Sequence, residues 1–164
     1  MRIGLISDTH GVFSEEFRDF FKDVDEIWHA GDFGGGMELA EKMAQFKPVI
    51  GVAGNCDDHK LRFIHPLHRF FECEGVKVLM THVGGYPGRY DRTARELIDR
   101  YRPDLFICGH SHILKVMRDP SRGGMLTMNP GAAGIQGFHL VRTALRFQID
   151  SGKIHDLEVY ELDR

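Results

Sequence analysis

Side chains that can bind metal stand directly after five short apolar runs of the sequence. The runs are GLIS, IWHAG, GVAG, VLMT and LFICG, and the residues that follow them are Asp8, His10, Asp32, Asn55, His82, His110 and His112. Two carboxylates, one amide and four imidazoles exceed the needs of one tetrahedral ion but suit two ions that share a bridging carboxylate. Imidazole-rich sites with some oxygen favour manganese, iron, nickel or zinc over calcium or magnesium. The pattern therefore predicts a site for two divalent transition-metal ions.

The charge of such a site indicates what it would bind. Two divalent ions, the carboxylates of Asp8 and Asp32 and a bridging hydroxide leave a net charge of about +1, which suits a phosphoryl group. A single histidine beside an apolar run is usually packed or solvated, and a single aspartate after a strand usually caps a helix. Repetition of the pattern at five run ends favours a functional site over these ordinary explanations.

The elements that must position these residues alternate in the first half of the chain. Apolar runs at 2–7, 26–30 and 48–53 are typical of buried strands, and apolar residues at helical spacing occupy 14–23 and 36–46. This order predicts parallel strands joined by right-handed crossovers. Because ligands of open α/β sheets bind outside the carboxyl ends of the strands, we expect the five run ends to meet at one crevice.

The second half of the chain is richer in strands. A hairpin is predicted at 69–82 around Glu74-Gly75, a helix at 93–101 and a strand at 104–108. Further strands are expected at 113–117, 125–128, 138–149 and 154–160. We predict one α/β domain over residues 1–164, containing two sheets.

Local geometry is expected to bring the ligands of each run end together. Side chains at positions i and i+2 of an extended chain point the same way, so Asp8 with His10, and His110 with His112, should each aim at a common point. Sharp turns of the backbone into the site are expected at three glycines, Gly31, Gly54 and Gly109.

Composition excludes several other classes of protein. The apolar stretch 1–6 is too short for a signal-peptide core or a membrane span. Three cysteines without a pairing pattern argue against a disulfide framework, so we expect a reducing, cytoplasmic location. A net charge of -3 provides no general attraction to nucleic acid or anionic lipid. Arginines in 89–102 alternate with acidic residues, which is typical of a solvated helix face rather than a nucleic-acid platform.

The motifs at the run ends resemble those of a known family. In order, DTH (8–10), GD (31–32), GNCD (54–57), TH (81–82) and GHSH (109–112) are similar to the motifs of calcineurin-like metallophosphoesterases. GNCD and the later NPG (129–131) most resemble the YfcE-type phosphodiesterase branch. The resemblance implies two β-sheets packed as a sandwich and flanked by helices in four layers (αββα), with a dinuclear metal site at the carboxyl ends of the strands.

The resemblance also implies the roles of individual residues. One ion would be held by Asp8, His10, Asp32 and His112, and the other by Asp32, Asn55, His82 and His110, so that Asp32 bridges. A metal-bound hydroxide would attack phosphorus in line, with Asp32, Asn55 and His82 as the catalytic set and manganese as the first choice of metal. Asn129 is a further candidate for orienting a ligand or contacting substrate. Asp57 is expected either to orient a ligand histidine or Asn55, or to cap the segment that follows it.

Two positions depart from the motifs of the family. Cys56 stands where many relatives have a histidine that helps the leaving group to depart, as is usual in the YfcE-like branch, and it is a further candidate for substrate contact. Ala132 stands where the family often has serine. Cys108, between two candidate ligand segments, is expected to pack in the core as a small apolar residue.

The remaining histidines are expected to pack or to lie at the surface. They are His29, His59, His65, His68, His139 and His155. Tyr86 and Arg89 follow His82 closely enough that either could touch substrate.

The sequence thus predicts a phosphodiesterase that acts on a small phosphodiester. An alternative of another class is a protein-binding scaffold like the retromer subunit, which has a similar fold and motifs, but complete ligand positions favour an enzyme. A phosphomonoesterase is less favoured because Cys56 replaces histidine, and a repair nuclease because the chain lacks the length and basic balance to hold DNA. A homo-oligomer is compatible with the sequence.

Overall fold

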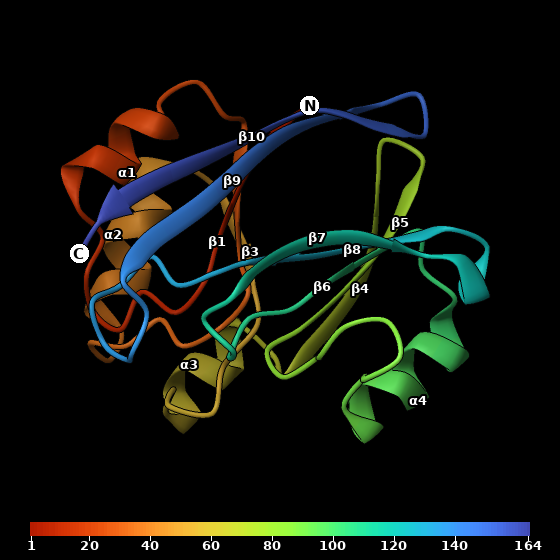
Figure 1. Ribbon diagram of the computed structural model, residues 1–164. Coiled ribbons are helices and arrows are strands. Elements are labelled where there is room, and N and C mark those ends of the chain that lie inside the picture. Colours follow the sequence, from red (N-terminus) through yellow and green to blue (C-terminus); the bar gives the residue numbers. More distant parts are fainter.

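Ten strands form two five-stranded sheets in the computed structural model, which describes residues 1–164 (Figure 1). The first sheet has the order β10-β9-β1-β2-β3 and contains Lys153–Asp163 (β10), Val141–Asp150 (β9), Arg2–Ile6 (β1), Glu26–His29 (β2) and Val49–Gly51 (β3). The second has the order β4-β5-β6-β8-β7 and contains His68–Cys73 (β4), Val76–Thr81 (β5), Leu105–Ile107 (β6), Met125–Pro130 (β8) and Leu114–Asp119 (β7). Both sheets mix parallel and antiparallel pairs.

Helices cover the outer faces of the sheets. α1 (Glu15–Phe20) and α2 (Glu38–Phe46) lie against the first sheet, and α4 (Arg92–Tyr101) lies against the second (Figure 1). A short α3 (His59–Ile64) lies at one edge of the sandwich, and a single 3₁₀ turn occupies Pro120–Arg122. No helix of the structure is long and apolar enough to cross a membrane.

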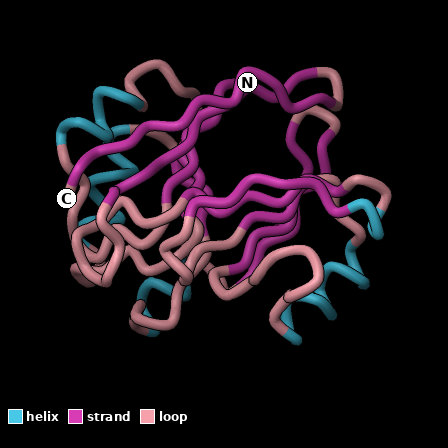
Figure 2. The backbone as a smooth tube through the Cα atoms, in the orientation of Figure 1, coloured by secondary structure: helices cyan, strands magenta, loops and turns pink.

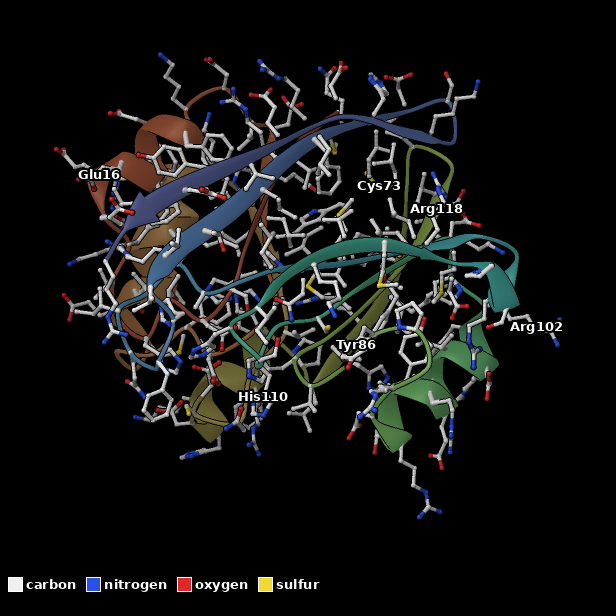
Figure 3. All side chains as sticks on the ribbon, viewed as in Figure 1. Glu16, Cys73, Tyr86, Arg102, His110 and Arg118 are labelled. Atoms are coloured by element: carbon white, nitrogen blue, oxygen red, sulfur yellow. The ribbon has the colours of Figure 1, made fainter.

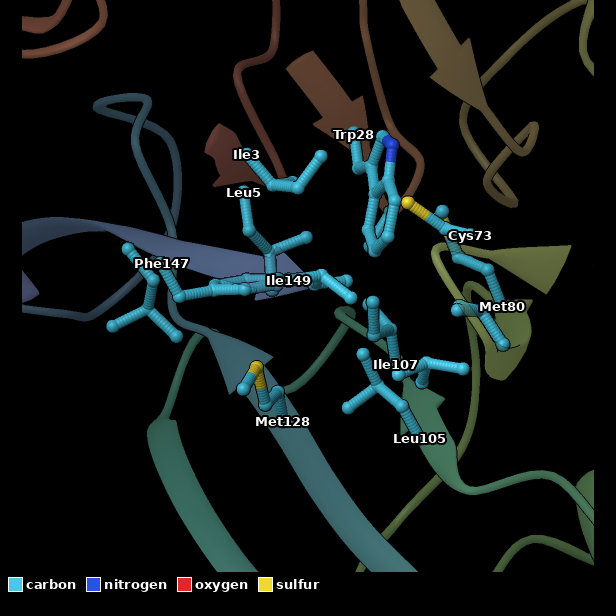
Figure 4. Close-up of a cluster of buried hydrophobic side chains, with 14 of the residues drawn as sticks. Ile3, Leu5, Trp28, Cys73, Met80, Leu105, Ile107, Met128, Phe147 and Ile149 are labelled. Atoms are coloured by element: carbon cyan, nitrogen blue, oxygen red, sulfur yellow. The ribbon is translucent and has the colours of Figure 1, made fainter. Parts of the chain in front are cut away.

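Alternation of side chains along the strands divides the apolar runs among three clusters. Leu5 and Met80 point into the cluster between the sheets, which Trp28 and Phe147 also fill (Figure 4). Ile6 points the other way, toward α1 and α2, with Phe17, Phe21 and Met43. Leu79 and Phe106 point toward α4. Because strands of the sandwich centre are buried on both faces, their sequences are continuous apolar runs rather than alternating ones.

The sequence predicted most of these elements. β1, β2 and β3 are parallel neighbours, as the alternation of strands and helices required. β4 and β5 form the expected hairpin, with Glu74 (φ 48°) and Gly75 (φ 84°) both left-handed in the turn. α3 was not predicted, because it has only six residues and exposes Phe63 and Ile64, so no apolar face marks it; Asp58 begins it by accepting a hydrogen bond from the Leu61 N–H.

The rings of His29, Phe33 and His65 form one stack. Phe33 stacks on His29 with ring centroids 3.6 Å apart, and on its other side on His65 at 4.9 Å. His65 is only 5% exposed. Burial, together with the charge of Arg69, lowers the pKa of His65 to about 4. His65 is therefore neutral in the folded protein at pH values where it is charged in the unfolded chain.

Stability should fall as the pH decreases from about 6.5 toward 4, because the unfolded chain then takes up a proton that buried His65 does not. His65→Phe preserves the stack and removes this titration. We expect the loss of unfolding free energy between pH 7 and pH 5 to be smaller by about 1–2 kcal/mol in the variant. Urea unfolding at the two pH values measures it, with the exposed His59→Phe as control. An equal loss in His65→Phe and wild type would contradict the assignment.

Candidate metal centre

The five run ends meet where the carboxyl ends of the parallel strands of both sheets lie together, among the loops along the lower edge of Figure 2. Backbone hydrogen bonds tie neighbouring loops: the Asp8 N–H donates to the Gly31 carbonyl at 2.9 Å, and the Gly109 N–H to the His82 carbonyl at 2.9 Å. The His110 N–H then crosses between the sheets to Asp8 Oδ2 at 3.0 Å. The expected convergence of the run ends is confirmed.

Asp8 lies at the centre of the site and is completely buried, with 0% exposure. Its Oδ2 accepts hydrogen bonds from the Ser7 hydroxyl at 2.6 Å and from the His110 N–H. Its Oδ1 has no hydrogen-bond partner and faces three imidazole Nε2 atoms, at 3.2 Å from His112, 3.8 Å from His10 and 3.8 Å from His82. One oxygen of Asp8 is thus held by protein, and the other is directed at a cluster of potential ligands.

Asp32 is the second buried carboxylate, with 3% exposure. Its Oδ1 accepts a hydrogen bond from the Cys56 N–H at 2.8 Å. Its Oδ2 lies 3.2 Å from His82 Nε2 and 3.7 Å from His10 Nε2, between imidazoles that the family resemblance would assign to different ions. His82 Nδ1 lies 2.7 Å from the Ala30 carbonyl, which only accepts, so Nδ1 carries a proton and Nε2 is directed at the carboxylates.

The carboxylate oxygens and imidazole nitrogens of the site fit a metal ion. Asp8 Oδ1, His10 Nε2 and His82 Nε2 are buried and have no hydrogen-bond partner. Ligands about 2.1 Å from a shared ion lie roughly 3.0–3.5 Å apart, close to the 3.2–3.8 Å between the carboxylate and imidazole atoms of the site. All ion-pair partners of Asp8 and Asp32 are histidines, so no lysine or arginine occupies the place of a cation.

Two further candidate ligands, Asn55 and His110, lie on the exposed side of the site. His110 Nδ1 is 3.1 Å from Asn55 Oδ1, and the His110 ring meets the His82 ring edge to face at 5.2 Å. His112 instead meets the His10 ring at 5.7 Å. The prediction that His110 and His112 aim at a common point is therefore wrong: one faces Asn55 and the other Asp8.

The reason is that the ligand segments are not extended. Five candidate ligands have left-handed backbone, with φ values of 53° at Asp8, 46° at His10, 57° at Asp32, 71° at His110 and 63° at His112. At His110 and His112 this backbone turns the two rings apart, whereas Asp8 Oδ1 and His10 Nε2 still approach each other to 3.8 Å. Left-handed backbone costs about 1–2 kcal/mol per non-glycine residue, and such conformations cluster at functional sites.

Two of the three site glycines are required by space rather than by conformation. A Cβ at Gly54 would collide with the Asp32 carboxylate, and one at Gly109 would collide with the Ser7 hydroxyl. Of the three, only Gly31 has a positive φ, of 102°.

Asp32 and His82 shift each other's pKa. Burial opposes ionisation of Asp32, but the adjacent His82 and the Cys56 N–H together lower the pKa of Asp32 to about 2. Burial likewise opposes charge on His82, but the neighbouring carboxylates of Asp32 and Asp8 raise the pKa of His82 above its ordinary value. The site therefore attracts positive charge.

Asp57 and Asn129 support the ligand loops from behind. Asp57 is expected to orient a ligand side chain, but its carboxylate instead accepts backbone N–H groups of Phe33 at 3.2 Å, Gly34 at 3.1 Å and Gly54 at 2.9 Å. Asn129 is 7% exposed; it donates to the Gly109 carbonyl at 2.9 Å and accepts from the Gly131 N–H at 2.9 Å. Both residues therefore fix loop backbone.

Cys56 and Cys108 differ in their surroundings. Cys56 is exposed, and its Sγ lies within 4.8 Å of the ligand atoms of His10 and Asp32. Partial burial and the charge of Asp32 raise the pKa of its thiol. Cys108 is 2% exposed and packs in the core behind α4, as expected.

Sequence reasoning missed two residues of the site. Ser7 donates to Asp8 Oδ2, but a serine at a strand end carries no signal of its own. His139 was expected to pack or to lie at the surface, yet its ring meets His112 edge to face at 5.1 Å, and its Nε2 lies 2.8 Å from the Gly134 carbonyl. Only the folded chain brings 134–139 beside His112.

Residues 1–152 match the sequence model of the calcineurin-like phosphoesterase superfamily domain. The chain belongs to this superfamily. It is 34% identical over 139 residues to a probable metallophosphoesterase of Methanothermobacter thermautotrophicus, a match that covers 80% of this chain and 77% of that protein. The phosphoesterase family that the motifs resembled is thereby confirmed.

Solved structures share the fold of this phosphoesterase domain. Vps29 of Entamoeba histolytica in complex with zinc superimposes with a TM-score of 0.74 over 99% of each chain, at 18% identity. A predicted phosphoesterase of Streptococcus pneumoniae superimposes with a TM-score of 0.67 over 99% of this chain and 97% of that one, at 23% identity. These likenesses confirm the sandwich of two sheets.

Asp57→Ala should both destabilise the protein and weaken metal binding, because three backbone N–H groups of two ligand loops lose their acceptor. The expected cost in unfolding free energy is about 2–4 kcal/mol. Asp58→Ala is the matched control, since it removes only the cap of α3, at about 1 kcal/mol. Urea unfolding and manganese titration calorimetry measure the two effects. Equal metal affinity in both variants would show that Asp57 does not support the site.

Proposed function

We propose that this chain is a metal-dependent phosphodiesterase that hydrolyses a small phosphodiester. The observation that carries the proposal is the group of buried atoms without hydrogen-bond partners, Asp8 Oδ1, His10 Nε2 and His82 Nε2, which face one another beside the Asp32 carboxylate. Most buried polar atoms are hydrogen-bonded, and three unpaired ones that converge beside a carboxylate are typical of a site that binds a cation. Membership of a phosphoesterase superfamily supplies the class of reaction.

Two divalent ions would be held by complementary sets of residues. One set is Asp8, His10, Asp32 and His112, and the other is Asp32, Asn55, His82 and His110. Manganese is the first choice, with iron, nickel or zinc as alternatives, because imidazole and carboxylate together favour these ions. Bound ions would supply a nucleophile at neutral pH and positive charge beside the phosphoryl group.

The chain's own residues would orient these ions and the substrate. Asp32 Oδ2 lies between His10 and His82, as a bridging ligand must. The Ala30 carbonyl fixes the tautomer of His82, so that Nε2 stays available. Asn55 and His110 are exposed, so the ester would approach from their side. Rigid strands hold all these groups before substrate arrives, which favours catalysis by positioning.

An enzyme is favoured over a binding scaffold. Vps29 shares the fold, so a protein-binding role is the alternative of another class. All seven candidate ligand positions are filled in this chain, however, and a complete ligand set favours an enzyme. A phosphodiester is favoured over a monoester because Cys56 occupies the position of a histidine that helps monoester leaving groups to depart. Three unpaired cysteines fit a cytoplasmic location.

Hydrolysis of bis(p-nitrophenyl) phosphate should disappear after exhaustive chelation and return with manganese.

Asp32→Asn should lower metal occupancy at both positions, because Asp32 belongs to both sets, whereas Asn55→Ala should empty mainly one. We expect kcat/KM of Asp32→Asn to fall by more than about a hundredfold, since even outer-shell substitutions cost about 10- to 100-fold.

Metal analysis and anomalous scattering of the variants measure occupancy, with the exposed Asp23→Asn as the control that should change neither metal content nor rate. Two fully occupied ions in Asp32→Asn would show that the bridge is assigned wrongly. Undiminished hydrolysis by protein free of metal would refute the dinuclear proposal.

Leaving groups should matter strongly, because a basic alkoxide needs a proton and a positioned general acid contributes about 10²–10⁴-fold. We expect fast cleavage of nitrophenyl diesters and slow cleavage of alkyl diesters. Cys56→Ala should change nitrophenyl hydrolysis less than about threefold, and Cys56→His should improve alkyl substrates. A leaving-group series on wild type and both variants measures this. A flat dependence on leaving-group pKa in wild type that is lost in Cys56→Ala would identify Cys56 as the acid.

A further inference from the structure

A pocket of ≈ 470 Å³ opens directly beside the candidate metal centre. Two of its lining residues, Asn55 and His82, are candidate ligands, so the pocket is continuous with the site. Its volume is within the range of pockets that hold small organic ligands. A phosphate bound at the metal centre could therefore place one of its ester substituents in this pocket without any movement of the chain.

The walls of the pocket come from the two helices at the site edge. Leu67 follows α3, Val83 follows β5, and Thr93 and Leu97 belong to α4. Figure 1 shows α3 and α4 at the same edge of the sandwich, and Figure 3 places His110 beside α3. None of these wall residues belongs to the proposed ligand sets, so the pocket extends beyond the metal centre.

The walls combine aliphatic side chains with polar ones, and two of the polar groups are already engaged in hydrogen bonds within the protein. The Asp91 carboxylate accepts the N–H groups of Thr93 and Ala94 as the cap of α4, and the Thr81 hydroxyl donates to the Val83 carbonyl at 3.0 Å. Arg62 and His68 also line the pocket, and no carboxylate forms an ion pair with the Arg62 guanidinium. An occupant would therefore have apolar faces and a polar edge, and it would carry no positive charge.

The side of the site on which the pocket lies indicates which substituent enters it. Cys56, at the position that the family resemblance associates with the leaving group, does not line the pocket, although its Sγ lies 3.6 Å from the Asn55 amide nitrogen. The pocket extends from Asn55 and His82 toward α4. Because the residue associated with the leaving group lies outside the pocket, the pocket is assigned to the substituent that remains on phosphorus.

We propose that this pocket is the specificity subsite of the enzyme and that it selects phosphodiesters whose retained substituent is a ring-bearing organic group of nucleoside size. This inference rests on the proposed phosphodiesterase function. A group that fills this pocket gains about tenfold or more in kcat/KM over a methyl group that leaves the pocket empty.

The test compares two diesters that share a p-nitrophenyl leaving group on the manganese-loaded protein. One retains a methyl group and the other retains thymidine through its 5′ oxygen. We expect kcat/KM to be at least about tenfold higher for the thymidine ester, chiefly through KM. Equal values for the two esters would overturn the subsite.

Two pairs of variants locate the effect. Leu67→Asp places a charge in the wall and should abolish the preference for thymidine, whereas Phe63→Asp, an equally drastic change at an exposed residue of α3 outside the pocket, should preserve it. Thr93→Trp fills the pocket without charge, and Glu96→Trp is its control on the outer face of α4. The same loss of preference in a variant and its control would refute the assignment.

A binding measurement separates failure of this subsite from failure of the phosphodiesterase proposal. Dissociation constants of thymidine 5′-phosphate and methyl phosphate are compared on the manganese-loaded wild type, Leu67→Asp and Phe63→Asp. If neither diester is hydrolysed, the proposed function fails. Tighter binding of thymidine 5′-phosphate that Leu67→Asp alone removes would still support the subsite, and equal binding of both phosphates would reject it.

Discussion

The burial of two carboxylates at the junction of the sheets is the constraint on which this structure depends. Removing an ionised carboxylate from water costs several kcal/mol even after relaxation. Hydrogen bonds from the protein reach only one of the two oxygens of each carboxylate. Asp8 Oδ2 is held by Ser7 and the His110 N–H, and Asp32 Oδ1 by the Cys56 N–H. The other oxygens face imidazoles and no fixed cation. This arrangement reaches electrostatic balance only with positive charge between the side chains.

The rest of the fold keeps that arrangement from relaxing. Left-handed backbone at five ligand positions costs conformational energy, and alternative loop structures would release it. Two features prevent these alternative loop structures. The strands β1, β2, β5 and β6 are buried on both faces, and side chains outside the ligand set form hydrogen bonds to the backbone of the loops. Asp57 joins the loop after β2 to the loop after β3, and Asn129 spans the segments at Gly109 and Gly131. The strands that form the core therefore also hold the geometry of the site.

The sequence predicted the parts that local pattern determines. Apolar runs located the strands, and residues after the runs located the candidate ligands, because parallel strands bring their carboxyl ends together whatever the loops do. What local pattern does not encode was missed. The left-handed turns at His110 and His112 direct the two rings to different neighbours, His139 reaches the site from β9's entry loop, and α3 has no apolar face. Each depends on contacts between segments far apart in the chain.

The architecture separates chemistry from recognition. The candidate ligands other than Asn55 follow strands that are buried on both faces, so substitutions there disturb the sheets as well as the site. The pocket walls, by contrast, belong to α3, α4 and their connections, and several wall residues, such as Leu67 at 57% exposure, contribute little to the core. Changes in these walls alter the shape beside the metal centre at small cost in stability. A small domain of this kind can therefore keep one ligand set while its edge helices adapt to different esters.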